Sequence, residues 1–529
     1  MASVLVLADT HETRPTTVAG RAPAVTYTAI GGVLLVLLAV TGSYGQWLSD
    51  SWIHAGTLVE VARHPLHPAE PLTGEHVGFP YFSPWAMALG WLMRLTGWSA
   101  WVVLTGAGLV GTGLLLASWY RLVRALTAAR WAPVVALVLM LLLWGTGTWF
   151  WSGFPSLATL SVGFVWPSVL ALACWFETWR TALRIEQVGT AHRILAFGVL
   201  PGLMLLIHPF TAAIATVSVL LTLATRVRRA AVPVATAVLA AAASGVLALA
   251  WPWTGLATMT GDRAGFDAIH HALYHDLAVK YGLLPLIVPA LLLRLRADRR
   301  DPLFWTAVLC GAGCAVGALT GFWSLARLGP GVLLPGQAAL AVLLAEGWSR
   351  RVRWGRRPRA GFAVLAGLTC LAVVIGGYAN AWAVARALPG TRFRAAAERA
   401  THAPVPYPQL GWIAGHVRPG DTAIANFWHA RRELATYGLR TVQPQWPSPG
   451  VPDAARRTAD QAGILNPRYG DAARRARLLA RYRVRWIVWQ SSARYPVWPY
   501  PGARLVACGP HRTALLRVDP AAGPPRACR

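Results

Sequence analysis

The sequence predicts an all-α polytopic membrane bundle of about 11 transmembrane helices, followed by an extracytoplasmic α/β domain. Two features of composition support this fold class: 55% of the 529 residues are hydrophobic and only 13% are charged. The third feature is order, because apolar runs long enough to cross a bilayer alternate with short arginine clusters. A chain of this length exceeds one ordinary domain, so at least two structural units are expected.

Residues 1–26 are predicted to form a cytoplasmic N-terminal segment. Arg14 and Arg21 precede the first apolar run, and no small-residue cleavage site follows that run. This pattern is typical of a retained first helix and differs from that of a cleaved signal peptide.

The apolar runs of residues 27–383 are predicted to form the transmembrane domain. They lie at 27–47, 101–120, 131–151, 158–178, 194–207, 210–225, 230–252, 280–296, 303–321, 331–348 and 361–383. Arginine clusters follow the second, fourth, sixth, eighth and tenth runs, which places those loops in the cytoplasm and residue 384 outside. The sequence therefore predicts a multi-pass protein of the inner or plasma membrane with a cytoplasmic N-terminus.

The net charge of +28 follows from the same topology. Before residue 384, 21 basic residues lie in segments assigned to the cytoplasm and five in segments assigned outside. This asymmetry needs no nucleic-acid partner, and none is predicted.

The run at 194–225 is long for one spanning helix and short for two. His208-Pro209 interrupts it, and both flanks are basic. We therefore expect two helices that meet near the outer face with His208 at the apex. A broken helix at membrane depth requires surrounding protein or a water-filled cavity.

Two long outer loops are predicted, at 48–100 and 254–279. The first contains five prolines and ends in an aromatic, amphipathic stretch, Tyr81 to Trp98, expected to lie on the membrane surface.

Residues 384–529 are predicted to form the extracytoplasmic soluble α/β domain. Core strands are expected at 421–426 and 484–489, a helix at 471–482, and a closing hairpin around Gly509-Pro510. The domain carries 23 arginines and seven acidic residues, a surface that would attract anionic lipids or acidic polymers. An oxidising compartment would allow Cys508 and Cys528 to form a disulfide, but the sequence leaves that pairing open.

The strongest local motif begins where the first helix leaves the membrane, at Ser49-Asp50-Ser51-Trp52-Ile53-His54. If Asp50 opens a short helix, His54 lies one turn further along the same face. A carboxylate there could act in catalysis, or it could simply cap the helix N-terminus.

With these residues in view, the chain resembles the GT-C superfamily of membrane glycosyltransferases, which use polyprenyl-phosphate sugars. The resembling features are the D-x3-H pattern of Asp50 and His54, a proline-rich stretch leading to Tyr81-Phe-Ser-Pro84, the mid-chain His208-Pro209, Arg327 before a Gly- and Pro-rich helix, and a soluble domain outside the membrane.

The resemblance implies transfer of a hexose or pentose from a polyprenyl-phosphate donor to a glycan or lipid acceptor. Asp50 would be the general base, with His54 beside it in the catalytic motif, while Arg327 and His208 would meet the charge of the departing phosphate. The family often shows two adjacent acidic residues in this loop, whereas Asp50 has no acidic neighbour; Glu60 is the nearest substitute.

Further site residues follow from residue type. Trp52 and Trp85 are candidate stacking rings for a sugar. Asp267, His271 and His275 recur at helical spacing and are candidate ligands of a divalent metal ion.

Two other functions remain open. One is a transporter or flippase of lipid-linked precursors, and the other is a non-catalytic cell-envelope assembly protein. A transporter would be expected to show paired repeats and charges at mid-membrane, and the sequence shows no obvious repeat.

Overall fold

The computed structural model describes residues 18–45, 48–254, 263–350, 356–401, 409–444, 450–466, 471–492, 498–523, 525 and 528. Most of the predicted N-terminal segment, residues 1–17, and residues 255–262 of the second outer loop lie outside this set. The chain divides into two compact units. The first comprises Met1–Tyr44, Gly108–Ala248 and Asp267–Pro404, and the second comprises Gly45–Ala107, Leu249–Phe266 and Val405–Arg529.

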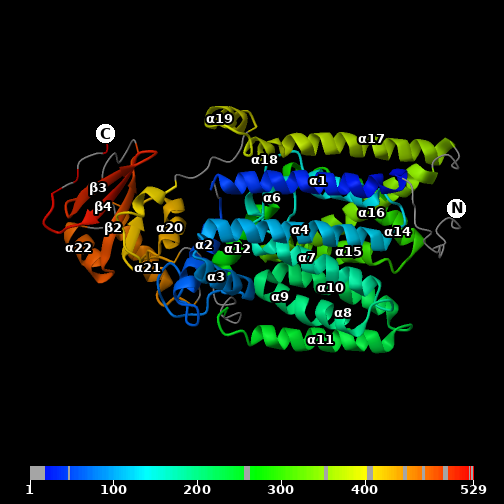
Figure 1. Ribbon diagram of the computed structural model, residues 1–529, viewed down its shortest axis with the longest axis horizontal. Helices are drawn as coiled ribbons and strands as arrows, with labels where there is room; N and C mark the ends of the chain where they lie inside the picture. The colour runs from blue at the N-terminus through cyan, green and yellow to red at the C-terminus, as the bar shows by residue number, and fades with distance from the viewer. Residues whose placement is uncertain are drawn as a thin grey trace. The chain divides into compact units, whose positions relative to one another are not determined.

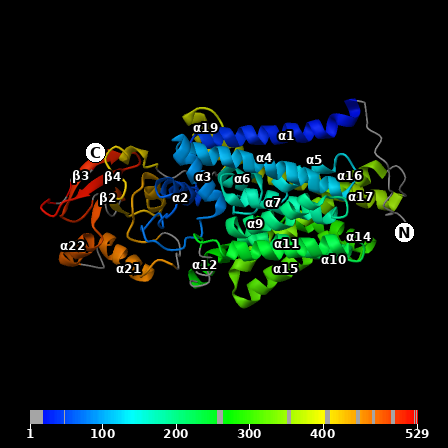
Figure 2. The ribbon, with the colours of Figure 1, turned by 60° about the horizontal axis from the view of Figure 1, so that its bottom comes forward.

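The first unit is helical. Its elements are α1 (Val18–Ser43), α4 (Ala100–Leu126, whose first turns belong to the second unit), α5 (Ala132–Leu142), α6 (Leu157–Gly163), α7 (Pro167–Leu183), α8 (Thr190–Ile194), the π-helical η1 (Leu195–Val199), α9 (Leu200–Ile207), α10 (Pro209–Arg226), α11 (Ala231–Leu249), η3 (His271–Tyr274), α13 (Leu277–Tyr281), η4 (Leu284–Ile287), α14 (Val288–Ala297), α15 (Pro302–Thr320), η5 (Trp323–Leu328), α16 (Pro330–Arg350), α17 (Arg356–Ala379), α18 (Ala381–Ala385) and α19 (Thr391–Ala400). The long helices run roughly parallel to one another in both views (Figures 1 and 2).

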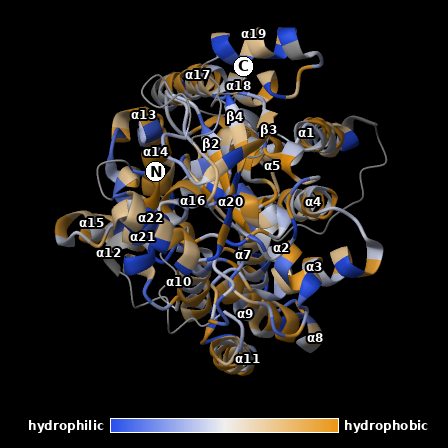
Figure 3. Cartoon of the chain, turned by 90° about the vertical axis from the view of Figure 1, so that its left-hand side faces the viewer, coloured by the Kyte–Doolittle hydropathy of each residue, from blue (hydrophilic) through white to orange (hydrophobic). Residues whose placement is uncertain are grey.

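Eight helical stretches of the described chain are long and apolar enough to cross a membrane. They are Arg21–Ser43, Ala100–Leu126, Thr190–Ile207, Pro209–Arg226, Ala231–Leu249, Pro302–Thr320, Trp323–Ser349 and Pro358–Ala379. Figure 3 shows α11 and α17 largely in the hydrophobic colours, and many of their exposed side chains are apolar, for example Leu239 and Val374. The chain is therefore a multi-pass membrane protein.

The other three predicted runs are not single long helices. In the run at 131–151, α5 ends at Leu142; the run at 158–178 is divided between α6 and α7; and the run at 280–296 is divided among α13, η4 and α14. Proline explains the break between α6 and α7, because Pro167 lacks an N–H and disfavours helical backbone in Trp166, which is extended with ψ 144°. The total of eleven crossings therefore stays a prediction.

The predicted break at His208 is present, since α9 ends at Ile207 and α10 begins at Pro209. Helix α10 is hydrogen-bonded to α7. Trp175 of α7 donates to the Ser218 hydroxyl of α10 at 2.8 Å, and Trp179 donates to the Thr222 hydroxyl at 2.9 Å. Hydrogen bonds between polar side chains are a common means of holding apolar helices together.

The second unit combines the first outer loop with the C-terminal tail. Its elements are α2 (Ser51–Arg63), α3 (Pro84–Thr96), α12 (Arg263–His270, which ends in the first unit), η7 (Gly411–Ile413), β1 (Thr422–Ala425), α20 (Trp428–Leu434), η8 (Ala435–Tyr437), α21 (Ala454–Leu465), α22 (Ala472–Arg481), β2 (Val484–Gln490), β3 (Ala503–Gly509) and β4 (Thr513–Val518). The strands and helix predicted for the tail are confirmed.

The four strands form one sheet in the order β1-β2-β4-β3, with β1 parallel to β2 and the other pairs antiparallel. Side chains alternate along β2, so its two faces build two cores. Ile487 and Trp489 pack with residues of α21 and α22, whereas Trp486 and Val488 pack with residues of α20.

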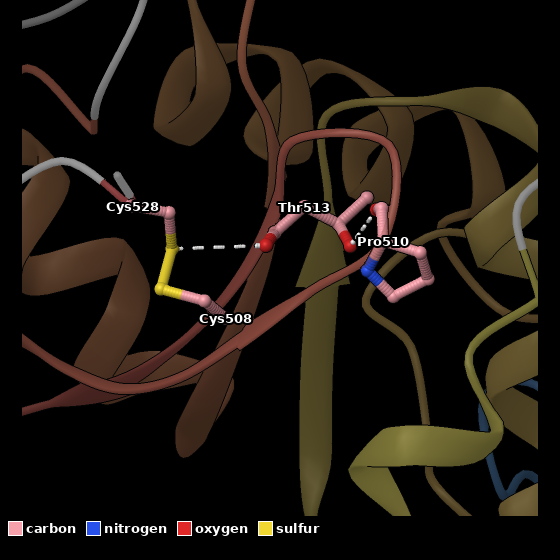
Figure 4. Close-up of a disulfide and its surroundings, with 4 residues drawn as sticks. All are labelled: Cys508, Pro510, Thr513 and Cys528. Atoms are coloured by element: carbon pink, nitrogen blue, oxygen red, sulfur yellow. Dashed lines mark hydrogen bonds between the residues drawn. A yellow bond between two sulfur atoms is a disulfide. The ribbon is translucent and has the colours of Figure 1, made fainter.

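Cys508 and Cys528 form a disulfide, which resolves the pairing that the sequence left open (Figure 4). It ties the end of β3 to the end of the chain, 20 residues later.

The first outer loop is folded around α2. Gly90 of α3 allows the closest approach, because an added Cβ would lie 2.5 Å from Val61 Cγ1 of α2. Gly56 of α2 likewise allows a close approach to η8 of the tail, because an added Cβ would lie 2.8 Å from Ala435 Cβ. Helix α2 is therefore packed between α3 and the tail.

Candidate functional site

Asp50 stands at the start of α2 and is paired with an arginine of the tail. Ser49 adopts a left-handed backbone with φ 55°, a conformation that non-glycine residues rarely take and that often marks functional sites. The Asp50 side chain makes no capping hydrogen bond to α2. Instead, its Oδ1 accepts a hydrogen bond from Arg432 Nη1 at 3.0 Å. The simple capping interpretation of Asp50 is therefore not what the structure has.

Arg432 lies on α20, a helix that packs against α2 (Figure 1). Its side chain is 3% exposed, and its Cζ lies 3.8 Å from the centre of the Trp428 ring. The next residue fixes the helix from its other side, since Glu433 Oε1 accepts from the Leu410 N–H and the Tyr437 hydroxyl. A guanidinium fixed in this way offers a carboxylate one defined position.

The free side of Asp50 distinguishes it from a purely structural acid. Its side chain is 28% exposed, and within the described residues Oδ2 makes no hydrogen bond. A carboxylate oxygen in this state can accept a proton or a hydroxyl donor from a ligand.

Glu60, the alternative base, is fully engaged. It is buried, and its two oxygens take an ion pair with Arg440 at 2.9 Å, a contact with His64 Nδ1 at 2.9 Å and the Ala69 N–H at 3.0 Å. These contacts fasten the loop that follows α2. They favour Asp50 over Glu60 as the carboxylate open to a substrate.

His54 follows Asp50 by one turn, as the motif predicts, but it is buried among aromatic rings. Its ring centroid lies 5.0 Å from that of Tyr81 and 5.6 Å from that of Trp85. Burial lowers the pKa of His54 to about 4, and the nearby Asp50 charge opposes this only in part. Nδ1 has no hydrogen-bond partner in the described chain. His54 is therefore neutral at pH 7, and no hydrogen bond between described side chains joins it to Asp50.

The two candidate stacking tryptophans differ in exposure. Trp52 is buried and packs edge to face against Trp101 with centroids 4.5 Å apart, which favours a packing role over sugar binding. Trp85, at the start of α3, is only half-buried and contacts the edge of His54.

His208 and Arg327, 119 residues apart in sequence, meet in the first unit. Arg327 Nη2 lies 2.6 Å from His208 Nε2, and His208 Nδ1 lies 2.7 Å from the Thr211 hydroxyl. Because the guanidinium can only donate, Nε2 accepts from Arg327. Nδ1 caps α10, where the Thr211 backbone N–H lies 3.3 Å away. The helix break at His208 thus presents a neutral imidazole to a buried cation.

The surroundings of this pair are aromatic and tight. Arg327 Cζ lies 4.8 Å from the centre of the Phe210 ring, and that ring lies 5.6 Å from His270. Gly153 has φ 86°, and a Cβ there would lie 3.0 Å from His208 Cε1. The planar fork of N–H donors on a guanidinium is chemically suited to a phosphate.

The weak metal candidates are only partly brought together. His275 Nε2 lies 3.2 Å from His271 Nδ1, whereas Asp267 Oδ1 accepts the Ser324 N–H at 3.0 Å and so caps η5. No group of three or more metal-ligating side chains occurs among the described residues. A metal ion stays a prediction.

Sequence reasoning missed the partners of the acidic side chains in the first outer loop. Three tail arginines, which the sequence presented only as basic surface, pair with acids of that loop. The pairs are Arg432 with Asp50, Arg440 with Glu60, and Arg457 with Glu75. The available signal was charge complementarity, because this loop contains four acidic residues and the tail is rich in arginine.

No protein-family model matches the chain, and no curated protein matches it. Among solved structures, the chain is similar to ArnT from Cupriavidus metallidurans bound to undecaprenyl phosphate, with 17% identity, 95% of this chain and 99% of that chain covered, and a TM-score of 0.49. It is also similar to the Archaeoglobus fulgidus oligosaccharyltransferase in the apo form, with 12% identity, coverage of 88% and 69%, and a TM-score of 0.48. The same organism's AglB in complex with an inhibitory peptide and a dolichol-phosphate gives 14% identity, coverage of 87% and 69%, and a TM-score of 0.45.

ArnT and AglB are both GT-C glycosyltransferases, the superfamily that the sequence resembles. All the TM-scores are below 0.5 and all the identities are below 20%. Neither the activity nor the functional residues of these proteins therefore transfer to this chain by similarity.

Proposed function

We propose that this chain is a membrane glycosyltransferase that moves a sugar from a polyprenyl-phosphate donor to an extracytoplasmic acceptor. The observation that supports it most is the contact between His208 and Arg327. A polyprenyl-phosphate donor requires a cation beside the apolar part of the protein, and a buried arginine at a broken membrane helix meets that requirement.

In the proposed reaction, the acceptor hydroxyl attacks the anomeric carbon of the donor sugar. Its oxygen forms the new glycosidic bond, its proton passes to the Asp50 carboxylate, and the bond from the anomeric carbon to the phosphate oxygen breaks. The polyprenyl phosphate leaves with the bonding electrons. Arg327 stabilises the charge that develops on the phosphate, because a fixed guanidinium needs no reorganisation during the step.

His208 supports Arg327 in this scheme. As a neutral acceptor that is itself anchored to Thr211, it orients the guanidinium without cancelling its charge. A carboxylate in the same place would neutralise the cation and weaken its attraction for phosphate.

The proposed orientation has eleven crossings and a cytoplasmic N-terminus, so that α2 faces the extracytoplasmic side. Single cysteines at His67, an exposed residue of the first loop, and at Gln187, an exposed residue of a predicted cytoplasmic loop, test it. An impermeant thiol reagent added to whole cells should label the first and spare the second. Labelling of position 187 alone would overturn the orientation.

The activity is tested with purified protein in liposomes and radiolabelled polyprenyl-phosphate sugars. Arg327→Lys retains the charge but loses the fork of donors, so we expect turnover to fall about a hundredfold. Arg299→Lys, an exchange at an exposed loop arginine, is the matched control and should leave turnover unchanged. Equal turnover of Arg327→Lys and the control would contradict the proposed role of Arg327, and a wild type that releases no sugar from any donor would contradict the function.

A further inference from the structure

Trp428, at the start of α20, is an exposed aromatic residue that has no role in the proposed reaction. The residue is 46% exposed, in a unit whose other tryptophans include the buried Trp486, Trp489 and Trp498. The Arg432 Cζ lies 3.8 Å from the ring centre, and the His429 ring makes a T-shaped contact with centroids 5.2 Å apart. An exposed ring held still by a buried cation is already organised for binding.

The same arginine connects this ring to the proposed base. Arg432 contacts Trp428 through its guanidinium plane and donates an N–H to Asp50 Oδ1 at 3.0 Å. One buried side chain therefore contacts both an aromatic ring and a partly exposed carboxylate. Both groups lie within the second unit.

This combination has a defined chemical complement. A sugar ring presents a face of C–H groups that packs on an aromatic ring, and hydroxyls around its edge that donate to carboxylates. Small-molecule sites commonly pair one aromatic surface with a few fixed polar groups in this way. A lipid chain would use the ring but not the carboxylate, and an inorganic anion would be repelled by Asp50.

We propose that Trp428, Arg432 and Asp50 form the subsite that binds the acceptor as a carbohydrate. Trp428 supplies the stacking surface, Arg432 positions both partners, and Asp50 accepts a hydrogen bond from the hydroxyl that reacts. This assignment rests on the proposed glycosyltransferase function and specifies its acceptor as a glycan. The tail thus contributes directly to substrate recognition.

Binding is measured on the full-length protein in a detergent without a sugar headgroup, by saturation-transfer NMR. The probes are the methyl glycosides of mannose, glucose, galactose and arabinofuranose. We expect transfer to at least one of them, about tenfold weaker binding for Trp428→Ala, and an intermediate value for Trp428→Phe. Trp305→Ala is the matched control, because Trp305 is 38% exposed and lies in the first unit.

Arg432→Lys tests the positioning role separately. Lysine retains the charge but not the planar contact with Trp428, so the KM for the acceptor should rise while thermal unfolding shows a folded protein. An unchanged affinity in both Trp428→Ala and Arg432→Lys would overturn the subsite.

Two outcomes separate this proposal from the function on which it rests. Loss of glycoside binding in Trp428→Ala, in a protein that transfers no sugar from any polyprenyl donor, would support the subsite and contradict the function. Sugar transfer by Trp428→Ala with the acceptor KM of the wild type would support the function and overturn the subsite.

Discussion

Removing Asp50 should destabilise the protein more than removing its partner, because the two charges differ in burial. The Arg432 side chain is 3% exposed and that of Asp50 is 28% exposed. In Asp50→Ala the guanidinium keeps its contact with Trp428 but loses its carboxylate in a buried site, and we expect a cost of about 3 kcal/mol. In Arg432→Met the carboxylate can be hydrated, and the expected cost is about 1 kcal/mol.

The double variant Asp50→Ala/Arg432→Met gives the sharper result. Replacing both members of a buried pair by apolar groups is often close to neutral, so the double variant should lie within about 1 kcal/mol of the wild type. The second substitution therefore rescues the first by about 2 kcal/mol. The assay is chemical unfolding of the full-length protein in one detergent, followed by circular dichroism. If the two single effects simply add, the ion pair does not couple α2 to α20 and the proposed support of Asp50 is refuted.

Three further predictions concern stability and use the same unfolding assay. Burial raises the pKa of Glu433 from 4.5 to about 7, so part of the free energy of unfolding that is present below pH 4.5 is lost as the pH rises through 7. Glu433→Gln should match the stability of the wild type at pH 4 and exceed it by about 3 kcal/mol at pH 8. Equal pH profiles of stability in the two proteins would contradict this. Gly90→Ala should cost about 1 to 3 kcal/mol through its clash with Val61, and Val61→Ala should restore part of the loss; a harmless Gly90→Ala would show that α2 and α3 do not pack this closely. Replacing Cys508 and Cys528 by alanine should lower stability by about 3 kcal/mol and abolish any effect of reductant, and a continuing response to reductant would contradict the disulfide.

Much of the membrane architecture followed from hydropathy and arginine placement. These patterns predicted the eight long helices and the break at His208, because lipid tolerates few alternatives to a continuous apolar helix. They did not predict that the runs at 158–178 and 280–296 are divided. Hydropathy averages over a window, whereas Pro167 acts on the backbone of a single residue, Trp166.

The tail was also readable in part. Short apolar runs between turn signals predicted β1, β2 and the β3–β4 hairpin. The disulfide between Cys508 and Cys528 could not be predicted with the same force, because pairing depends on the separation of the two Cα atoms, which a sequence does not carry.

The candidate site was also predicted only in part from the sequence. The D-x3-H motif, the His-Pro break in an apolar run and the resemblance to the GT-C superfamily identified Asp50, His208 and Arg327 as candidates. Their partners lie 382 and 119 residues away and required the fold. Arg432 in particular could not be distinguished among 23 tail arginines, since any of them carries the same charge.

The most direct measurement is the turnover of Asp50→Asn in liposomes that contain a polyprenyl-phosphate sugar and a glycan acceptor. Asparagine retains an oxygen for Arg432 but cannot take a proton, so turnover should fall by about a hundredfold to ten-thousandfold while polyprenyl phosphate still binds. A folded Asp50→Asn protein that transfers sugar at the rate of the wild type would contradict the assignment of Asp50 as the base.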